Sequence, residues 1–330
     1  MRHVPLALTL LIRVSPPVRA AETRALGAQA WPVMIGPHIV RLCVSLLFVA
    51  AAFAPRGLLA QLPGLPNLPQ SVKFAVIGDS GDGKHGQYEI ARQMAASHKA
   101  FPFDLVIMVG DNLYGGQTAA DYVDKFERPY GPLLEAGVVF QAALGNHDAP
   151  ESRSYRPFNM NGERYYTFAR RNVRFFVLDT NFIDDKQLAW IDAALGASQE
   201  EWKICYFHHP LYSNARRHGS SVDIRVLLEP ILVRHRVNVV FSGHDHVYER
   251  IKPQKGIHYF VAGSGGLLRK GDLRPSDITA AGFDRDQAFM LVEIAGREMV
   301  FHAISRAGAV VDSGVIVRGQ TLRQMTDGTR

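Results

Sequence analysis

The stretch Val72-Lys73-Phe74-Ala75-Val76-Ile77-Gly78-Asp79 joins a short apolar run to a glycine and a carboxylate. Valine, isoleucine and phenylalanine favour a buried strand, and glycine lets the chain turn sharply where the strand ends. Similar runs recur at 105–109, 138–142, 173–178, 204–207, 237–241 and 259–262. Between them, residues 88–97, 186–195 and 224–235 carry apolar side chains at helical spacing. This alternation predicts an α/β domain.

The C-terminal part of the sequence has a different pattern. Apolar runs at 289–294, 299–304 and 310–317 are separated by short segments that contain glycine. Because no helical pattern lies between them, they predict an antiparallel meander. Neither a repeat nor an internal linker interrupts residues 71–330, so we expect these residues to form one domain.

The charge of the chain lies mostly at its N-terminus. The 330 residues carry a formal net charge of +6, which on its own suggests a polyanionic partner. Residues 1–60 hold six arginines and one glutamate, a net of +5, and the other 270 residues carry 31 basic and 30 acidic side chains. We therefore expect no nucleic-acid partner. The two cysteines, Cys43 and Cys205, lie far apart and indicate no disulfide framework.

Residues 42–54 form an uncharged run of 13 residues that follows Arg41. A membrane-spanning helix needs about 20 apolar residues, so this length is typical of the h-region of a signal peptide. We expect residues 1–60 to be an N-terminal extension with a signal peptide, and the mature protein to be exported, either periplasmic or secreted. The alternative is an uncleaved N-terminal anchor. Residues 61–70, with Pro63, Pro66 and Pro69, predict an extended linker.

Polar side chains follow five of the predicted strands directly. The segments concerned are Gly78-Asp79, Gly110-Asp111-Asn112-Leu113-Tyr114, Gly145-Asn146-His147-Asp148, His208-His209-Pro210 and Gly243-His244-Asp245-His246. One such segment alone is more often a turn or a helix cap. Open α/β sheets bind their ligands at the carboxyl ends of the strands. Five segments in this order therefore predict a metal site.

The ordered set of these motifs resembles the calcineurin-like metallophosphoesterases and, among them, the purple acid phosphatases of the small single-domain type. The resemblance runs from about residue 72 to residue 246 and beyond. It implies a four-layer α/β/β/α sandwich of two mixed β-sheets for residues 71–330. Many superfamily members have a metal-binding histidine where this chain has Gly81, and the resemblance implies that Tyr114 replaces it.

The resemblance also implies the metal ligands and the metals. One ion would be held by Asp79, Asp111, Tyr114 and His246, and the other by Asp111, Asn146, His208 and His244. The first would be Fe³⁺, and the second Fe²⁺, Zn²⁺ or Mn²⁺. The two ions would together carry a charge of +5. The two carboxylates, the phenolate and a bridging hydroxide would together carry −4. The net charge of about +1 would attract a phosphate group.

The resemblance thus implies that the protein is an exported acid phosphatase. In such an enzyme a metal-bound hydroxide attacks a small phosphate monoester. We expect His147 to donate a proton to the leaving group. The family has a substrate-facing histidine nine or ten residues after the ligand that matches His208, which makes His218 the second catalytic candidate.

Several alternatives stay open. The same scaffold could carry a phosphodiesterase or nucleotidase, which would differ in loops such as 114–130 and 265–283, or a protein that binds phosphate or metal without catalysis. Arg216 and Arg217 either touch phosphate or form a solvated loop. Asp148 either fixes His147 or caps a turn, and His209 is expected to orient a strand end without binding metal.

Overall fold

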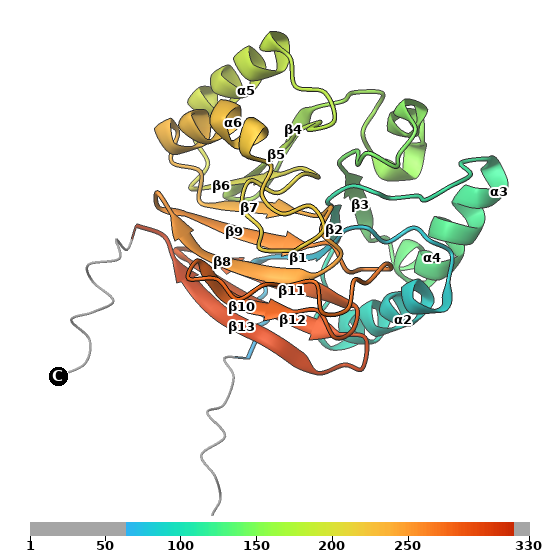
Figure 1. The fold of residues 1–330 in the computed structure, drawn as a ribbon. Helices are drawn as coiled ribbons and strands as arrows, with labels where there is room; N and C mark the ends of the chain where they lie inside the picture. Colours follow the sequence, from blue (N-terminus) through green and yellow to red (C-terminus); the bar gives the residue numbers. More distant parts are fainter. Residues whose placement is uncertain (1–63, 320–330) are drawn as a thin grey trace, which may run out of the picture. The chain divides into compact units, whose positions relative to one another are not determined.

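Two mixed β-sheets form the centre of the computed structural model, which describes residues 64–319 (Figure 1). The six-stranded sheet has the order β13-β12-β11-β1-β2-β3. Its strands are β1 (Val72–Ile77), β2 (Leu105–Met108), β3 (Val139–Ala142), β11 (Ala288–Ala295), β12 (Glu298–Ser305) and β13 (Val310–Val317). Strands β1, β2 and β3 are parallel, and β11, β12 and β13 form the predicted antiparallel meander.

The second sheet has seven strands in the order β10-β8-β9-β7-β6-β5-β4. They are β4 (Tyr166–Arg170), β5 (Val173–Val177), β6 (Trp202–Tyr206), β7 (Val239–Ser242), β8 (Tyr248–Gln254), β9 (Ile257–Ala262) and β10 (Thr279–Phe283). Strands β5, β6, β7 and β9 run parallel. Their carboxyl ends therefore lie at one edge of the sheet, as do those of β1, β2 and β3 in the first sheet.

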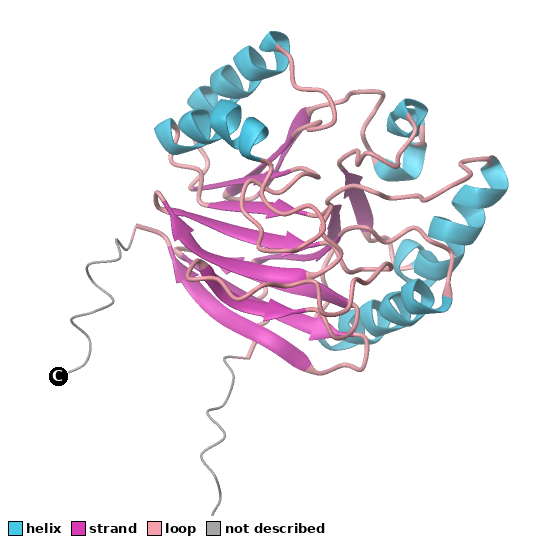
Figure 2. Cartoon of the chain, viewed as in Figure 1, coloured by secondary structure: helices cyan, strands magenta, loops and turns pink. Residues whose placement is uncertain are grey.

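Burial on both faces explains why the strands are almost wholly apolar. In β1, Phe74 and Val76 pack into the core between the two sheets, whereas Ala75 and Ile77 pack toward the helices outside the six-stranded sheet. The outer helices are α2 (His85–Ala100), α3 (Ala119–Tyr122) and α4 (Arg128–Glu135) on that sheet, and α5 (Asp185–Ala197) and α6 (Val222–Arg234) on the other. Figure 2 shows the helices on the two outer sides. The expected four-layer α/β/β/α sandwich is confirmed.

The connections contain more regular structure than the sequence predicts. The segment 114–130, expected as a loop, contains α3 and a π-helical turn, Val123–Glu127, which leads into α4. Thr118 and Asp121 form a capping box at the start of α3, but Pro129 and Pro132 interrupt the sequence pattern of a helix. Two short 3₁₀ helices, Pro150–Ser154 and Arg156–Phe158, follow β3, and β10 lies in the expected loop 265–283.

The predicted signal peptide, including residues 42–54, lies outside the described residues. Residues 64–70 of the predicted linker lie against the six-stranded sheet, because the buried Glu293 carboxylate accepts the backbone N–H groups of Asn67 and Leu68 at 2.6 Å. Within 64–319, no helix has the length and hydropathy needed to cross a membrane. Cys205 is a buried free thiol.

Candidate metal centre

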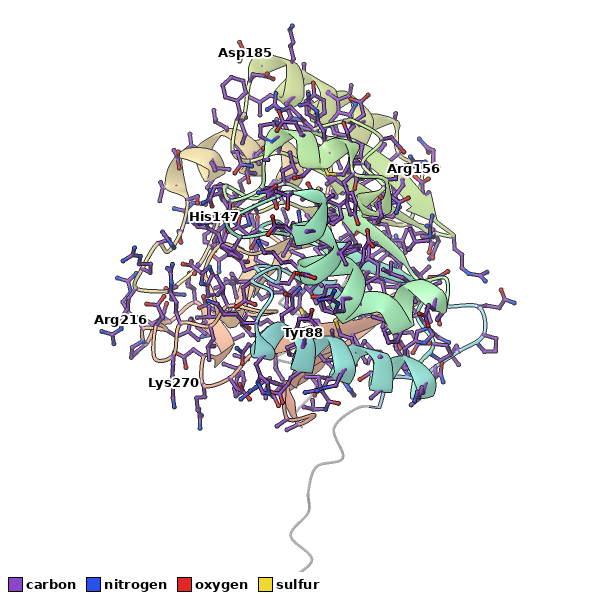
Figure 3. The ribbon with its side chains drawn as sticks, turned by 90° about the vertical axis from the view of Figure 1, so that its right-hand side faces the viewer. Tyr88, His147, Arg156, Asp185, Arg216 and Lys270 are labelled. Carbon is purple, nitrogen blue, oxygen red and sulfur yellow. The ribbon has the colours of Figure 1, made fainter. Side chains whose placement is uncertain are left out.

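The seven predicted metal ligands come together where the two sheets present their carboxyl ends. Asp79 follows β1, and Asp111 and Tyr114 follow β2, while Asn146 follows β3. The histidines come from the other sheet: His208 follows β6, and His244 and His246 follow β7. Side chains from five strand ends and from both sheets thus meet in one place, beside the loop that carries His147 in Figure 3.

The first group of side chains surrounds the Tyr114 hydroxyl. This oxygen lies 2.8 Å from Asp111 Oδ2, 3.0 Å from Asp79 Oδ1 and 3.1 Å from His246 Nε2. His246 Nε2 also lies 3.4 Å from Asp79 Oδ1. Ligand atoms about 2.1 Å from a shared ion lie about 3.0–3.5 Å from one another. The four side chains therefore have the spacing of ligands around one cation.

The second group surrounds the Asn146 side-chain carbonyl. Asn146 Oδ1 lies 3.1 Å from His208 Nε2 and 3.0 Å from His244 Nδ1, and these two nitrogens are 3.2 Å apart. The other carboxylate oxygen of Asp111, Oδ1, lies 3.4 Å from His208 Nε2. Asp111 therefore contributes one oxygen to each group, as a ligand that bridges two ions would.

The backbone is held in an uncommon conformation around this site. Asp79, Asp111 and His244 have φ angles of 52°, 51° and 70°, in the left-handed region that non-glycine residues rarely adopt. Gly110, with φ of 93°, leaves no space for a side chain, because a Cβ atom there would lie 2.6 Å from the His208 ring. Strain of this kind concentrates at functional sites. Here the left-handed backbone conformation directs the side chains of Asp79, Asp111 and His244 into the same site.

Asp111 and His208 stabilise each other's charged forms. Burial alone would raise the pKa of Asp111, but hydrogen bonding to His208 and its positive charge hold it well below the ordinary value. Burial opposes protonation of His208, yet Asp111 raises its pKa to about 9. Because metal binding requires an unprotonated nitrogen, an ion in the second group must displace this proton.

The donor set of the site fits metal ions. Burial, and then the charges of Asp79 and Asp111, raise the pKa of Tyr114 far above its usual range, so only a cation beside the oxygen could yield a phenolate. Burial and the charge of His208 lower the pKa of His244 to about 2, which keeps that ring neutral and able to bind metal. The backbone carbonyl of Val109, 3.1 Å from His208 Nδ1, fixes the proton there and leaves Nε2 to face the site.

The two catalytic candidates lie beside different groups of ligands: His147 beside the first group and His218 beside the second. The exposed His147 ring packs on Tyr114 with centroids 4.6 Å apart, and its backbone N–H donates to Asp111 Oδ1 at 2.8 Å. The His218 ring lies 4.2 Å from that of His244 and is also exposed. Burial, followed by the charges of Arg269 and Arg217, lowers the pKa of His218.

Neighbouring residues have structural partners. The Asp148 carboxylate accepts backbone N–H groups from Gly145, Asn112 and Leu113 at 2.8–3.1 Å, so it ties the loops after β2 and β3 together and does not hold the His147 ring. The ring of His209 lies 4.4 Å from that of His244, but its Nδ1 lies 3.0 Å from the Thr180 hydroxyl. The nitrogens of His209, His208 and His244 are close enough for a third metal-binding combination.

Two acidic residues that the sequence reasoning missed position the His218 loop. The buried Asp245 carboxylate accepts the Gly219 N–H at 3.2 Å. The buried Glu249 carboxylate accepts the backbone and side-chain N–H groups of Asn214, both at 2.9 Å. Both acids belong to the motif Gly243-His244-Asp245-His246-Val247-Tyr248-Glu249-Arg250. Asp245 stands between two histidines and Glu249 between Tyr248 and Arg250, and this position could have identified them from the sequence.

The sequence of the chain is similar to those of known acid phosphatases. The chain is 28% identical over 315 residues to purple acid phosphatase 4 of Arabidopsis thaliana, a match that covers 82% of this chain and 92% of the relative. It is 26% identical over 287 residues to tartrate-resistant acid phosphatase type 5 of Sus scrofa, covering 72% and 84%. The chain is thus a distant homologue of the purple and tartrate-resistant acid phosphatases over most of its length.

Solved structures share the fold. A purple acid phosphatase from yellow lupin seeds superposes with a TM-score of 0.64 at 19% identity, covering 79% of this chain and 56% of that one. The Plasmodium protein GAP50, an anchor in the inner membrane complex, superposes with a TM-score of 0.63 at 18% identity, covering 76% and 90%. Residues 72–248 match the sequence profile of calcineurin-like phosphoesterases. The chain therefore belongs to the calcineurin-like phosphoesterase family.

Proposed function

We propose that this metallophosphoesterase is an acid phosphatase of the purple type that hydrolyses small phosphate monoesters. The observation that carries the proposal is the Tyr114 hydroxyl, which lies 2.8–3.1 Å from three other predicted ligands of the first group. At Gly81, where many superfamily members have a metal-binding histidine, a Cβ atom would lie 1.7 Å from the Asn112 carbonyl oxygen. The tyrosine therefore takes the place of that histidine, and an Fe³⁺ ion is the partner we propose for it.

The protein's own residues would bind the substrate and move protons. One ion in each group of ligands would lower the pKa of bound water and neutralise the charge of the phosphoryl oxygens. We propose Fe³⁺ in the first group and Fe²⁺, Zn²⁺ or Mn²⁺ in the second. His147 and His218, both exposed beside the site, can reach a bound phosphate ester from opposite groups. The lowered pKa of His218 makes its imidazolium a stronger acid once it is protonated, which requires acid solution.

Turnover of matched substrates tests the proposal. We expect metal-loaded protein to hydrolyse 4-nitrophenyl phosphate with a kcat/KM at least about tenfold above that for bis(4-nitrophenyl) phosphate, and with an acid pH optimum. Preference for the diester would instead favour the phosphodiesterase alternative. Absence of turnover for both, with both metals bound, would favour a binding protein without catalysis.

We further propose that the protein is exported through a signal peptide that contains residues 42–54. The support is the 13-residue uncharged run after Arg41, which is too short to span a membrane comfortably. N-terminal sequencing of protein recovered from its native host should place the mature start between about Ala54 and Gln70. A mature chain that begins before Leu42 and stays in the cytoplasm would contradict export.

A further inference from the structure

A cavity of about 390 Å³ opens beside the second group of metal ligands. Asn146, whose side-chain oxygen faces His208 and His244, forms part of its wall. The wall continues through Arg153 in the 3₁₀ helix Pro150–Ser154, through Arg164, which precedes β4, and through Phe182, which follows β5. A phosphate ester held at the metal site could therefore place its organic part in this cavity.

The charged groups of the wall leave one cation without a partner. Arg164 Nε donates to Asp179 Oδ2 at 2.7 Å, and the Asp148 carboxylate is satisfied by backbone N–H groups. Among residues 64–319, the guanidinium of the half-buried Arg153 makes neither an ion pair nor a hydrogen bond. A guanidinium that faces a cavity in this way favours a carboxylate or another planar anion, which it can bind through two N–H groups.

The same wall offers an apolar surface. The Phe182 side chain is 62% exposed, although large hydrophobic side chains are mostly buried in this fold. The Arg164 guanidinium lies 5.0 Å from the centre of the Phe182 ring and so helps to hold it in place. A ring fixed at the mouth of a polar cavity is suited to stack against a flat organic group.

We propose that this cavity is the leaving-group subsite of the phosphatase, and that it takes a planar leaving group that carries an anionic substituent. The inference rests on the proposed function. Arg153 binds the anion and Phe182 packs against the ring. The volume lies at the lower end of the range of small-molecule sites, so a leaving group of one substituted ring fits better than a larger one.

The test compares two ring substrates of the same shape. 4-Carboxyphenyl phosphate carries the anion, whereas 4-carbamoylphenyl phosphate replaces it by a neutral amide. In Arg153→Gln, we expect the ratio of their kcat/KM values to shift about tenfold or more against the carboxylate. Arg156→Gln is the matched control, because Arg156 is exposed and lines a different hollow three residues along. Figure 3 shows Arg156 well away from His147. An unchanged ratio in Arg153→Gln would overturn the proposal.

A binding measurement separates this inference from the activity. 4-Phosphonobenzoate cannot be hydrolysed, so calorimetry on metal-loaded protein reports the subsite even if the chain does not turn over monoesters. We expect its Kd to rise about tenfold in Arg153→Gln, and to change by less than about twofold in Arg156→Gln. Phe182→Ala should weaken binding of both 4-phosphonobenzoate and its amide. Equal affinities of wild type and Arg153→Gln would refute the subsite, whatever the outcome with 4-nitrophenyl phosphate.

Discussion

Asp111 uses its two carboxylate oxygens for different groups of side chains. Oδ2 lies 2.8 Å from the Tyr114 hydroxyl, and Oδ1 lies 3.4 Å from His208 Nε2. The His147 N–H donates to the same Oδ1 and so restrains the carboxylate from behind. At the scale of single residues, the centre is therefore organised around one acid that both groups share.

His147 touches this acid only through its backbone, which leaves its imidazole free for the substrate. His147→Ala should therefore retain both metals and lower kcat by about 10²–10⁴-fold, the usual contribution of a positioned proton donor. Metal analysis beside steady-state kinetics measures both quantities. His98→Ala, on α2 against Phe103, is the control for loss of an imidazole elsewhere. Loss of one metal in His147→Ala would make His147 a ligand and overturn its assignment.

At the scale of elements, the segment that begins β8 connects the metal site with the rest of the fold. Glu249 holds the loop that carries His218, while Tyr248 and Arg250 both donate to Asp312 on β13 of the other sheet. Arg250 binds that carboxylate through two hydrogen bonds of 2.7 and 3.0 Å. The motif after His246 thus joins the two sheets.

Asp312→Ala should lower the free energy of unfolding by about 2–3 kcal/mol, because it leaves the half-buried Arg250 guanidinium and the buried Tyr248 hydroxyl without their carboxylate partner. Urea denaturation measures the change. Asp124→Ala removes an acid of the same type that pairs with Arg128 at the surface, where the two side chains are 54% and 61% exposed, and should cost less than about 1 kcal/mol. Equal losses in the two variants would show that the link between the sheets contributes no more than a surface pair.

The sequence predicted those elements whose information is local. Ten strand positions, and the polar residues that follow five of them, could be found, because these strands are mostly apolar and a strand end needs a turn. The helices in 119–135 were missed because Pro129 and Pro132 obscure their pattern. The roles of Asp245, Glu249 and Asp148 could not be predicted, since each depends on backbone groups from another loop.

Across the whole molecule, the packing of two sheets buries or half-buries several titratable groups. His258 on β9 is one of these: burial, and then the charge of Arg250, lower its pKa to about 4. An unfolded chain binds this proton near pH 6.5. The folded chain therefore has its full stability above about pH 6.5 and loses stability as the pH falls toward 4.

His258→Gln should reduce this acid sensitivity. Between pH 6.5 and pH 4, we expect the wild-type free energy of unfolding to fall by up to about 3 kcal/mol more than that of the variant. Each unit of difference between the folded and unfolded pKa corresponds to about 1.4 kcal/mol. Urea titrations at several pH values give the two slopes. His85→Gln, at a side chain that is 76% exposed, is the control. Parallel slopes for wild type and His258→Gln would assign the acid sensitivity to other groups.

We propose that Tyr114 binds a ferric ion in a binuclear phosphatase centre, and the visible absorption of iron-loaded protein reports on this bond. A tyrosinate bound to Fe³⁺ absorbs visible light, so oxidised wild-type protein should be coloured and Tyr114→Phe should lose the band. His208→Ala, which removes a ligand of the second group only, should keep the colour and lose the divalent ion. A wild-type protein without a visible band, or a Tyr114→Phe variant that retains it, would contradict the account.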